Sequence, residues 1–398
     1  MCTSTTMASK KLATSLLVTP EWLLPRLSGG GKLRMLDCSM YLPHMKRDAQ
    51  AEYDARRIPG SAFFDIDACS APGPFEHTLP GAAPFQEYVR ALGVDDGDEV
   101  VLYDGLGIFS APRVWWMLRE YGVASRVLDG GLPAYVAAGG TLEEGAPPAI
   151  AGGTFTAVAR EPAGWCDLAA LRANVELPDD GADGAAAAAR LPVLDARAGG
   201  RYLGTAPEPR AGLPSGPIPR SISVPFSSLL GDGGTYKAPE ELRRTFAEAG
   251  FAPSGGGSEP PRFFASCGSG VTACAVILGA ELAFGGGVEA TLFDGAWTEW
   301  GTTVVLPLLE ELQGALPRAA AEAAASDPQA ATALREAAAL LAELQMVEGA
   351  GRALVALGTA SEAGGGSTPA ADECRKLALQ LLPDFDEATW RATFDKSE

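Results

Sequence analysis

The sequence is poor in histidine and in positive charge. Two histidines, His44 and His77, occur in 398 residues, and neither belongs to a pattern with metal-ligand spacing. Lysine and arginine number 31 against 50 acidic residues, which gives a formal net charge of −19. We therefore expect no zinc site, and we do not expect so acidic a chain to bind nucleic acid or an anionic membrane surface. An anionic substrate would need a local basic pocket.

Long apolar runs and paired cysteines are also missing. No run approaches the roughly 18 apolar residues that would suggest a membrane span. The seven cysteines are an odd number without a Cys-x-x-Cys pair, which predicts no disulfide framework and an intracellular compartment, cytoplasmic or mitochondrial. The opening MCTSTTMASKKLATSLLV lacks acidic residues, as in a transit peptide, but it has no arginine and also fits a short disordered tail.

An internal repeat runs through the first three quarters of the chain. Four segments of the first copy have counterparts in the same order in the second: LRMLD and LPVLD, IPGSAFFDI and IPRSISVPF, EVVLYD and RFFASC, VLDGGLPAY and LFDGAWTEW. The offset grows slowly, from 158 residues between Asp37 and Asp195 to 165 residues between Asp129 and Asp294. This is typical of a tandem duplication. In the third pair, Asp104 of the first copy takes the position of Cys267 in the second.

Each copy alternates short apolar runs with helical patterns. We predict strands at Glu99–Tyr103 and Arg262–Ser266, and helices at Ala111–Tyr121 and Val271–Phe284. Alternation of this kind predicts a parallel sheet with helices on both faces, hence an α/β protein with two tandem domains.

The composition predicts where these domains begin and end. We place a tail at 1–15, a first domain at 16–144, a Pro- and Gly-containing linker at 145–164 and a second domain at 165–305. An Ala-rich stretch at 179–190 is expected to form a surface loop. Residues 306–398 become rich in Ala and Leu and more acidic, which predicts a helical extension. Helix starts are expected at 326–328 and 368–369, with a joint at 364–367.

The most informative segment is FFASCGSGVTACAVILGAELAF, in which a strand leads through a Gly-rich turn into a helix. Cys267 begins that turn. Inward-pointing backbone N–H groups and a helix N-terminus favour the thiolate, which is the form that attacks sulfur, and they could also hold a persulfide. The pattern alone fits a small buried cysteine equally well. Cys274, further along the helix, is expected to be a packed residue rather than a redox partner.

CGSGVTA resembles the active-site loop of the 3-mercaptopyruvate sulfurtransferases, a tandem rhodanese-domain family. RRIPGSAFFDIDAC, SAPRVWWMLREYG, LDARAGGRYLGTAPEPR and FDGAWTEW are similar to further blocks of that family, so the resemblance covers roughly residues 16–303. It implies two rhodanese-like domains, of which the second is catalytic. Asp104 in place of a cysteine is consistent with an inactive first copy. The extension after residue 305 lies outside the resemblance.

The resemblance also implies roles for individual residues. Cys267 would be the nucleophile, in a substrate-binding loop with Gly268, Gly270, Val271 and Thr272. Arg201 and Arg210 match two arginines that bind the substrate carboxylate, for which a planar guanidinium is suited. Ser269, His77 and Asp67 match a serine–histidine–aspartate relay. Because His77 and Asp67 belong to the first copy, the relay requires the two copies to pack across the site.

The expected reaction moves sulfur from 3-mercaptopyruvate, through a Cys267 persulfide, to a thiol such as thioredoxin or to cyanide, without a cofactor. Thiosulfate:cyanide sulfurtransferase activity is the nearest alternative. Gly268 and Ser269 argue against it, because thiosulfate-specific relatives carry Arg and Lys there. A Cys-x5-Arg phosphatase would need Arg where this chain has Ala273. A non-catalytic interaction protein, acting through its C-terminal helices, is the third alternative.

Overall fold

The computed structural model divides the chain into two compact units. The first joins Met1–Arg197 to Ile222–Ala296, and the second joins Ala198–Ser221 to Trp297–Glu398. The residues that the structure describes are 16–27, 33–177, 190–252, 260–285, 287–324, 328, 331–335, 337–338, 353–354 and 368–381. The predicted tail, most of the 179–190 loop, residues 326–327 of the first helix start and the 364–367 joint lie outside them.

The first copy is built on a five-stranded sheet in the order β1-β6-β5-β2-β4. All four strand pairings are parallel. The strands are β1 (Leu17–Val18), β2 (Leu33–Asp37), β4 (Ser61–Phe63), β5 (Glu99–Tyr103) and β6 (Ser125–Leu128). The helices are α2 (Pro20–Leu27), η1 (Pro43–Met45), α3 (Ala49–Ala55), α4 (Ala82–Ala91), α5 (Ala111–Glu120) and α6 (Gly131–Ala137). A small antiparallel pair, β3 (Arg56–Arg57) and β7 (Glu143–Glu144), lies outside this sheet.

The second copy repeats this plan with the order β10-β9-β11-β12-β8. Its strands are β8 (Trp165–Cys166), β9 (Val193–Asp195), β10 (Ser221–Ser223), β11 (Arg262–Ser266) and β12 (Glu289–Phe293). Its helices in the first unit are α7 (Leu168–Val175), η2 (Phe226–Leu229), α10 (Pro239–Glu248) and α11 (Ala273–Phe284). The predicted α/β class is confirmed, and both predicted strands have the expected bounds. Helix α11 begins two residues later than predicted, because Val271 and Thr272 belong to the turn.

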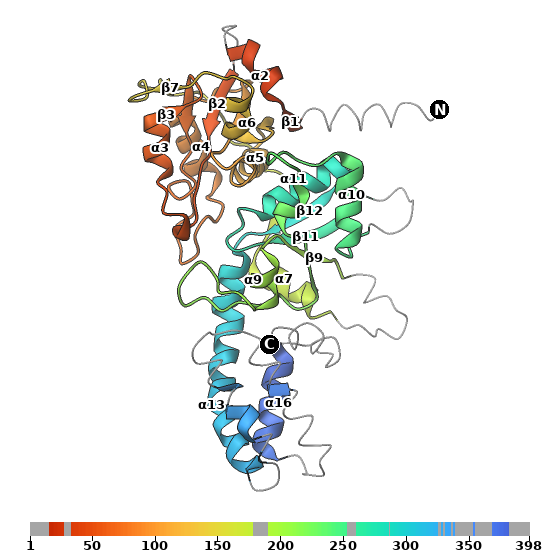
Figure 1. Ribbon diagram of the computed structural model, residues 1–398. Helices are drawn as coiled ribbons and strands as arrows, with labels where there is room; N and C mark the ends of the chain where they lie inside the picture. The colour runs from red at the N-terminus through yellow and green to blue at the C-terminus, as the bar shows by residue number, and fades with distance from the viewer. Residues whose placement is uncertain are drawn as a thin grey trace, which may run out of the picture. The chain divides into compact units, whose positions relative to one another are not determined.

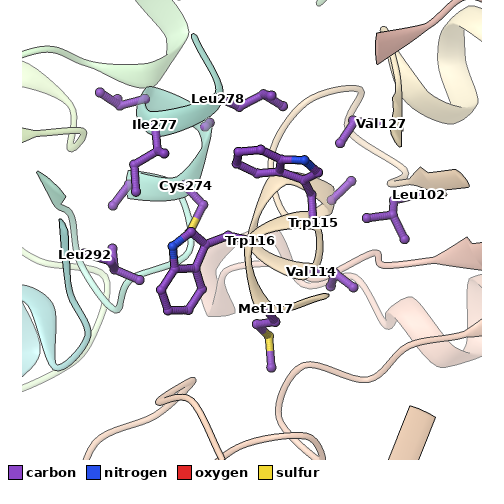
Figure 2. Close-up of a cluster of buried hydrophobic side chains, with 14 of the residues drawn as sticks. Leu102, Val114, Trp115, Trp116, Met117, Val127, Cys274, Ile277, Leu278 and Leu292 are labelled. Atoms are coloured by element: carbon purple, nitrogen blue, oxygen red, sulfur yellow. The ribbon is translucent and has the colours of Figure 1, made fainter. Parts of the chain in front are cut away.

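One hydrophobic core serves both copies. Every residue of α5 from Ala111 to Leu118 is buried, and Trp115 and Trp116 are at most 2% exposed. Figure 2 shows these two indole rings between side chains of the first copy and side chains of α11 and β12, all of which belong to one buried cluster. Two large aromatic side chains buried across a seam strongly favour a fixed arrangement of the two halves. The shared core therefore fixes the loops of one copy relative to those of the other.

The second unit combines a loop segment with the C-terminal helices. Helix α9 (Gly199–Leu203) lies in the loop segment, and α12 (Ala296–Trp300) continues through η3 (Gly301–Val305) into α13 (Leu306–Ala323). Helix α16 (Pro369–Leu381) packs beside α13 (Figure 1). Arg318 pairs with Glu373 at 2.7 Å between them. The hydroxyl of Thr368 accepts a hydrogen bond from the backbone N–H of Ala371, which confirms the helix start predicted there.

Candidate active site

Cys267 follows directly on β11 and begins the turn that leads into α11. The strand RFFAS is apolar and largely buried, whereas the Gly-Ser-Gly that follows cannot continue it. Cys267 is 2% exposed, and the rest of the turn up to Val271 is buried as well, with Thr272 half-buried. The strand, the turn and the helix therefore have the arrangement that the sequence predicted around Cys267.

Gly270 has a backbone conformation and a position that only glycine suits. Its φ is +78°, and a Cβ atom built there would lie 3.1 Å from the backbone oxygen of Asp294 and 3.3 Å from Nη1 of Arg113. Within the described residues, the backbone N–H groups of Gly270, Val271 and Thr272 donate to no acceptor. With the N-terminus of α11 behind them, these groups make the turn a suitable place for an anion.

The structure brings Ser269, His77 and Asp67 together. Nδ1 of His77 lies 2.7 Å from Oγ of Ser269, and Nε2 lies 2.7 Å from Oδ1 of Asp67. His77 and Ser269 are buried, whereas 71% of the Asp67 side chain is exposed. An ionised Asp67 can only accept, so Nε2 carries the proton and Nδ1 accepts from the Ser269 hydroxyl. The three groups form a hydrogen-bonded chain that ends in the turn begun by Cys267.

The backbone around His77 is held by residues that the sequence analysis did not single out. His77 has a φ of +64°, in the left-handed region. Nη2 of Arg113 donates to the carbonyl oxygen of His77 and to Oδ1 of Asp294, the latter at 2.9 Å. The backbone N–H of Leu79 donates to Oδ2 of Asp294 at 2.7 Å. A lone arginine inside the apolar run APRVWWML was the available signal for this arrangement.

Cys274 faces the turn from the first turn of α11. Its thiol donates to the carbonyl oxygen of Gly270 at 3.3 Å, and burial raises the pKa of this thiol to about 12. It therefore stays protonated at working pH and contributes a hydrogen bond to the turn rather than a second nucleophile. The six cysteines in the described part of the chain are all free and buried.

The two predicted carboxylate-binding arginines belong to the second unit. Arg201 lies on α9, and its Nε donates to Oε2 of Glu208 at 3.0 Å. The Glu208 side chain is fully buried and the Arg201 side chain is 18% exposed, so Glu208 fixes one edge of the guanidinium. Arg210 is half-buried in the same loop segment. Binding of a carboxylate by this pair stays a prediction, and Glu208 was missed from the sequence.

Among the described residues, no group of three or more His, Cys, Asp or Glu side chains could hold a metal ion. No helix in the described part of the chain is long and apolar enough to cross a membrane.

Comparison with known proteins identifies the family. A rhodanese-like domain matches residues 19–138. The 3-mercaptopyruvate sulfurtransferase of Homo sapiens is 42% identical over 302 residues, which are 74% of this chain and 94% of the relative. The corresponding enzyme of Rattus norvegicus is 40% identical over 294 residues, with 71% and 91% covered.

The chain belongs to the tandem rhodanese-domain sulfurtransferases.

Further members of this family show the breadth of its donor chemistry. The thiosulfate sulfurtransferase of Rattus norvegicus is 39% identical over 292 residues, 71% of this chain and 91% of the relative. SseA of Escherichia coli, described as a 3-mercaptopyruvate sulfotransferase, superposes with a TM-score of 0.59 at 31% identity, over 71% of this chain and 99% of SseA. The protein is thus a sulfurtransferase enzyme, and relatives of similar identity differ in the sulfur donor that they are named for.

Proposed function

We propose that this sulfurtransferase takes sulfur from 3-mercaptopyruvate as a persulfide on Cys267 and passes it to a thiol, thioredoxin or cyanide. The hydrogen-bonded chain from Asp67 through His77 to Ser269 carries the proposal, because it ends at Ser269, two residues after Cys267 in the turn. The chain joins the two copies, so the docked pair of domains is the functional unit.

The transfer step balances without an external oxidant or reductant. The Cys267 thiolate attacks the substrate sulfur, a sulfur–sulfur bond forms, and the carbon–sulfur bond breaks with its electron pair going to carbon. The enolate of pyruvate leaves and must gain a proton, while the transferred sulfur gives up the proton of the substrate thiol. We assign the Ser269–His77 pair to accept that proton and to return one to the enolate. Arg201 and Arg210 are assigned to the substrate carboxylate.

The relay favours 3-mercaptopyruvate over thiosulfate as donor. The carbon leaving group of 3-mercaptopyruvate requires a proton, whereas sulfite leaves thiosulfate as a stable anion and requires none. The turn also carries neutral Gly268 and Ser269 where the family pattern for thiosulfate carries Arg and Lys. A dianionic donor would gain more than a monoanion from such cations, so their absence weakens the case for thiosulfate.

The proposal is tested by assaying the purified enzyme with both donors. We expect a higher kcat/KM for 3-mercaptopyruvate, release of pyruvate, and one added sulfur atom on the peptide that contains Cys267 when the acceptor is withheld. Cys267→Ala should abolish both the release of pyruvate and the added sulfur atom. Cys38→Ala is the matched control, because Cys38 is a buried cysteine directly after β2 in the first copy. A preference for thiosulfate would overturn the assigned donor, and sulfur on another cysteine would overturn the mechanism.

A further inference from the structure

We infer that Arg113 and Asp294 form a positioning clamp, which holds the backbone of His77 so that its ring meets Ser269. The inference rests on the proposed relay and adds two residues to it, one from each copy. Neither residue touches the reacting sulfur in this assignment. Both act through His77, by fixing where its imidazole lies.

The backbone of His77 needs such support. A non-glycine residue at a φ of +64° is strained, and it keeps that conformation only where the surroundings fix it. Here the fixing contacts lie at the carbonyl group of His77 and just after it in the chain. Arg113 binds the carbonyl oxygen of His77, and Asp294 accepts the N–H of Leu79 two residues later. Because Asp294 also pairs with Arg113 at 2.9 Å, the three contacts form one connected unit.

Stability alone does not account for an arginine at this position. The Arg113 side chain is fully buried in an apolar helix, and its Nε and Nη1 have no hydrogen-bond partner within the described residues. A buried ion pair is often no better for stability than apolar residues of similar volume. Besides Asp294, the titratable groups that face the guanidinium are the thiols of Cys274 and Cys69, and burial raises the pKa of both to about 12. Asp294 is thus the carboxylate that balances it.

The second copy offers an internal control for this reasoning. The offset of 163 residues that relates Asp104 to Cys267 places Val276 of α11 where α5 has Arg113. At this reciprocal contact Asp129 of the first copy plays the part of Asp294, since its Oδ1 accepts the backbone N–H of Tyr236 in the second copy at 2.9 Å. The loop it holds has Gly234 at the position of His77, two residues before Tyr236. The fold therefore tolerates an apolar residue in place of the arginine, and the arginine occurs in the copy whose own loop carries the histidine.

The clamp predicts a kinetic signature that mere loss of stability would not give. Arg113→Met should lower kcat with 3-mercaptopyruvate by about 10–100-fold, the effect of misplacing a reacting group by up to an ångström, with little change in KM. In a His77→Ala background the same substitution should cost less than about threefold, because the relay is already broken. Arg113→Lys should lie between wild type and Arg113→Met. Asp294→Asn should also be intermediate, since an amide keeps one acceptor oxygen.

Nuclear magnetic resonance of the histidine rings tests the clamp independently of turnover. The chain has two histidines, so His44→Gln leaves the ring nitrogens of His77 as the remaining imidazole signals. We expect these signals to move in Arg113→Met and in Arg113→Lys. The matched control is Arg57→Met, which removes an equally buried guanidinium that pairs with Glu143 at 2.6 Å in the first copy.

The outcomes of this experiment distinguish failure of the clamp from failure of the proposed relay. Unchanged His77 signals in folded Arg113→Met and Arg113→Lys proteins would overturn the clamp, whatever the turnover. Signals that move equally in the Arg57→Met control would overturn it as well. Signals that move only in the Arg113 variants support the clamp. If kcat then stays at the wild-type value, the proposed relay fails while the clamp stands.

Discussion

The turn after β5 begins with Asp104, and the turn after β11 begins with Cys267. Both turns contain a glycine with positive φ at the fourth position, Gly107 at +110° and Gly270 at +78°, and both lead into a buried helix. In the first copy the carboxylate of Asp104 accepts four backbone N–H groups at 2.9–3.0 Å, from Leu106, Phe109, Ser110 and Ala111. The backbone plan of this turn is thus a cradle for an anion. A fixed carboxylate fills it in the first copy, and the sulfur of Cys267 takes its place in the second.

Each turn also lies against a loop of the other copy. The N–H of Leu79 reaches Asp294, and the N–H of Tyr236 reaches Asp129, so the two copies dock on one another reciprocally. What differs is the chemistry at the two points of contact. Ser269 meets His77 at one, whereas Leu106 lies near Gly234 at the other. The duplication thus supplies two equivalent frameworks, and in the proposed mechanism a few side chains make one of them the active site.

Exchanging the first residue of the active turn is expected to have the largest effect. Cys267→Asp copies the first turn into the second, so sulfur transfer should fall by more than about 10⁴-fold, as when an enzyme loses its nucleophile. The variant should nevertheless melt at a higher temperature than Cys267→Ala, because the new carboxylate can accept the N–H groups of the turn. A Cys267→Asp protein less stable than Cys267→Ala would show that the two turns are not equivalent cradles.

Removing the histidine that distinguishes the two contacts is expected to have the next largest effect. His77→Ala should lower turnover with 3-mercaptopyruvate by about 10²–10⁴-fold, the usual range for general acid–base help, with a smaller loss for Asp67→Asn. His77→Ala and Ser269→Ala should not multiply in the double variant, because either one breaks the same relay. His44→Ala, at an exposed histidine of the first copy, is the control and should keep the wild-type rate. Clean multiplication of the two losses would argue that Ser269 and His77 act separately.

Much of this comparison could be read from the sequence, because strands and glycines leave local signals. Both sheets follow from apolar runs flanked by turn residues, and Cys267 is conspicuous at the junction of a strand, a turn and a helix. The contacts that complete the site leave weaker signals. The bonds of Arg113 to the His77 carbonyl and to Asp294 join positions 36 and 181 residues apart. Such pairings depend on how the copies dock, which no local pattern encodes. The pairing of Arg201 with Glu208 was missed for a different reason: an acidic residue in a loop is expected to be exposed, whereas Glu208 is buried.

The glycines of the two turns should respond differently to the same change. Gly270→Ala forces a left-handed φ on alanine and puts a methyl group against Asp294 and Arg113, so it should lower kcat by about 10²-fold through displacement of the turn. Gly107→Ala meets backbone oxygens at 3.4–3.5 Å and should cost about 1–3 kcal/mol of stability while leaving kcat within a few-fold. Kinetics and thermal melting on both variants measure the contrast. Equal losses of kcat would mean that strain in either turn reaches the active site.

The aspartates that end β2 and β9 provide a contrast in stability. Asp195 pairs with Arg197, both fully buried, so Asp195→Asn should cost about 3 kcal/mol of folding stability by removing the charge that faces this cation.

Asp37 instead accepts from Ser39, and burial raises the pKa of Asp37 to about 6. A folded-state pKa above the unfolded value means that stability is lost as the pH rises from about 4 to about 6, here on the order of 2–3 kcal/mol. Asp37→Asn should abolish this loss. Denaturant unfolding at pH 4 and pH 8 measures both variants, and an Asp37→Asn protein with the wild-type pH dependence would contradict the assignment.

Removing the C-terminal extension is expected to have the smallest effect on activity. The last contacts that hold the loop segment of Arg201 and Arg210 come from α12 and the start of η3: Nε1 of Trp297 donates to the carbonyl oxygen of Pro214 at 2.6 Å, and Gly301 lies against Leu213. Helix α13 beyond them packs on α16. A chain ending at residue 305 should therefore fold and keep kcat/KM for 3-mercaptopyruvate within about threefold, less than the loss of one hydrogen bond to a charged group. A stop at residue 295 is the matched control and should lose activity, because it removes Trp297. If the chain ending at 305 loses as much activity as the shorter one, the two copies alone do not make a complete active site, and the extension is a third part of it.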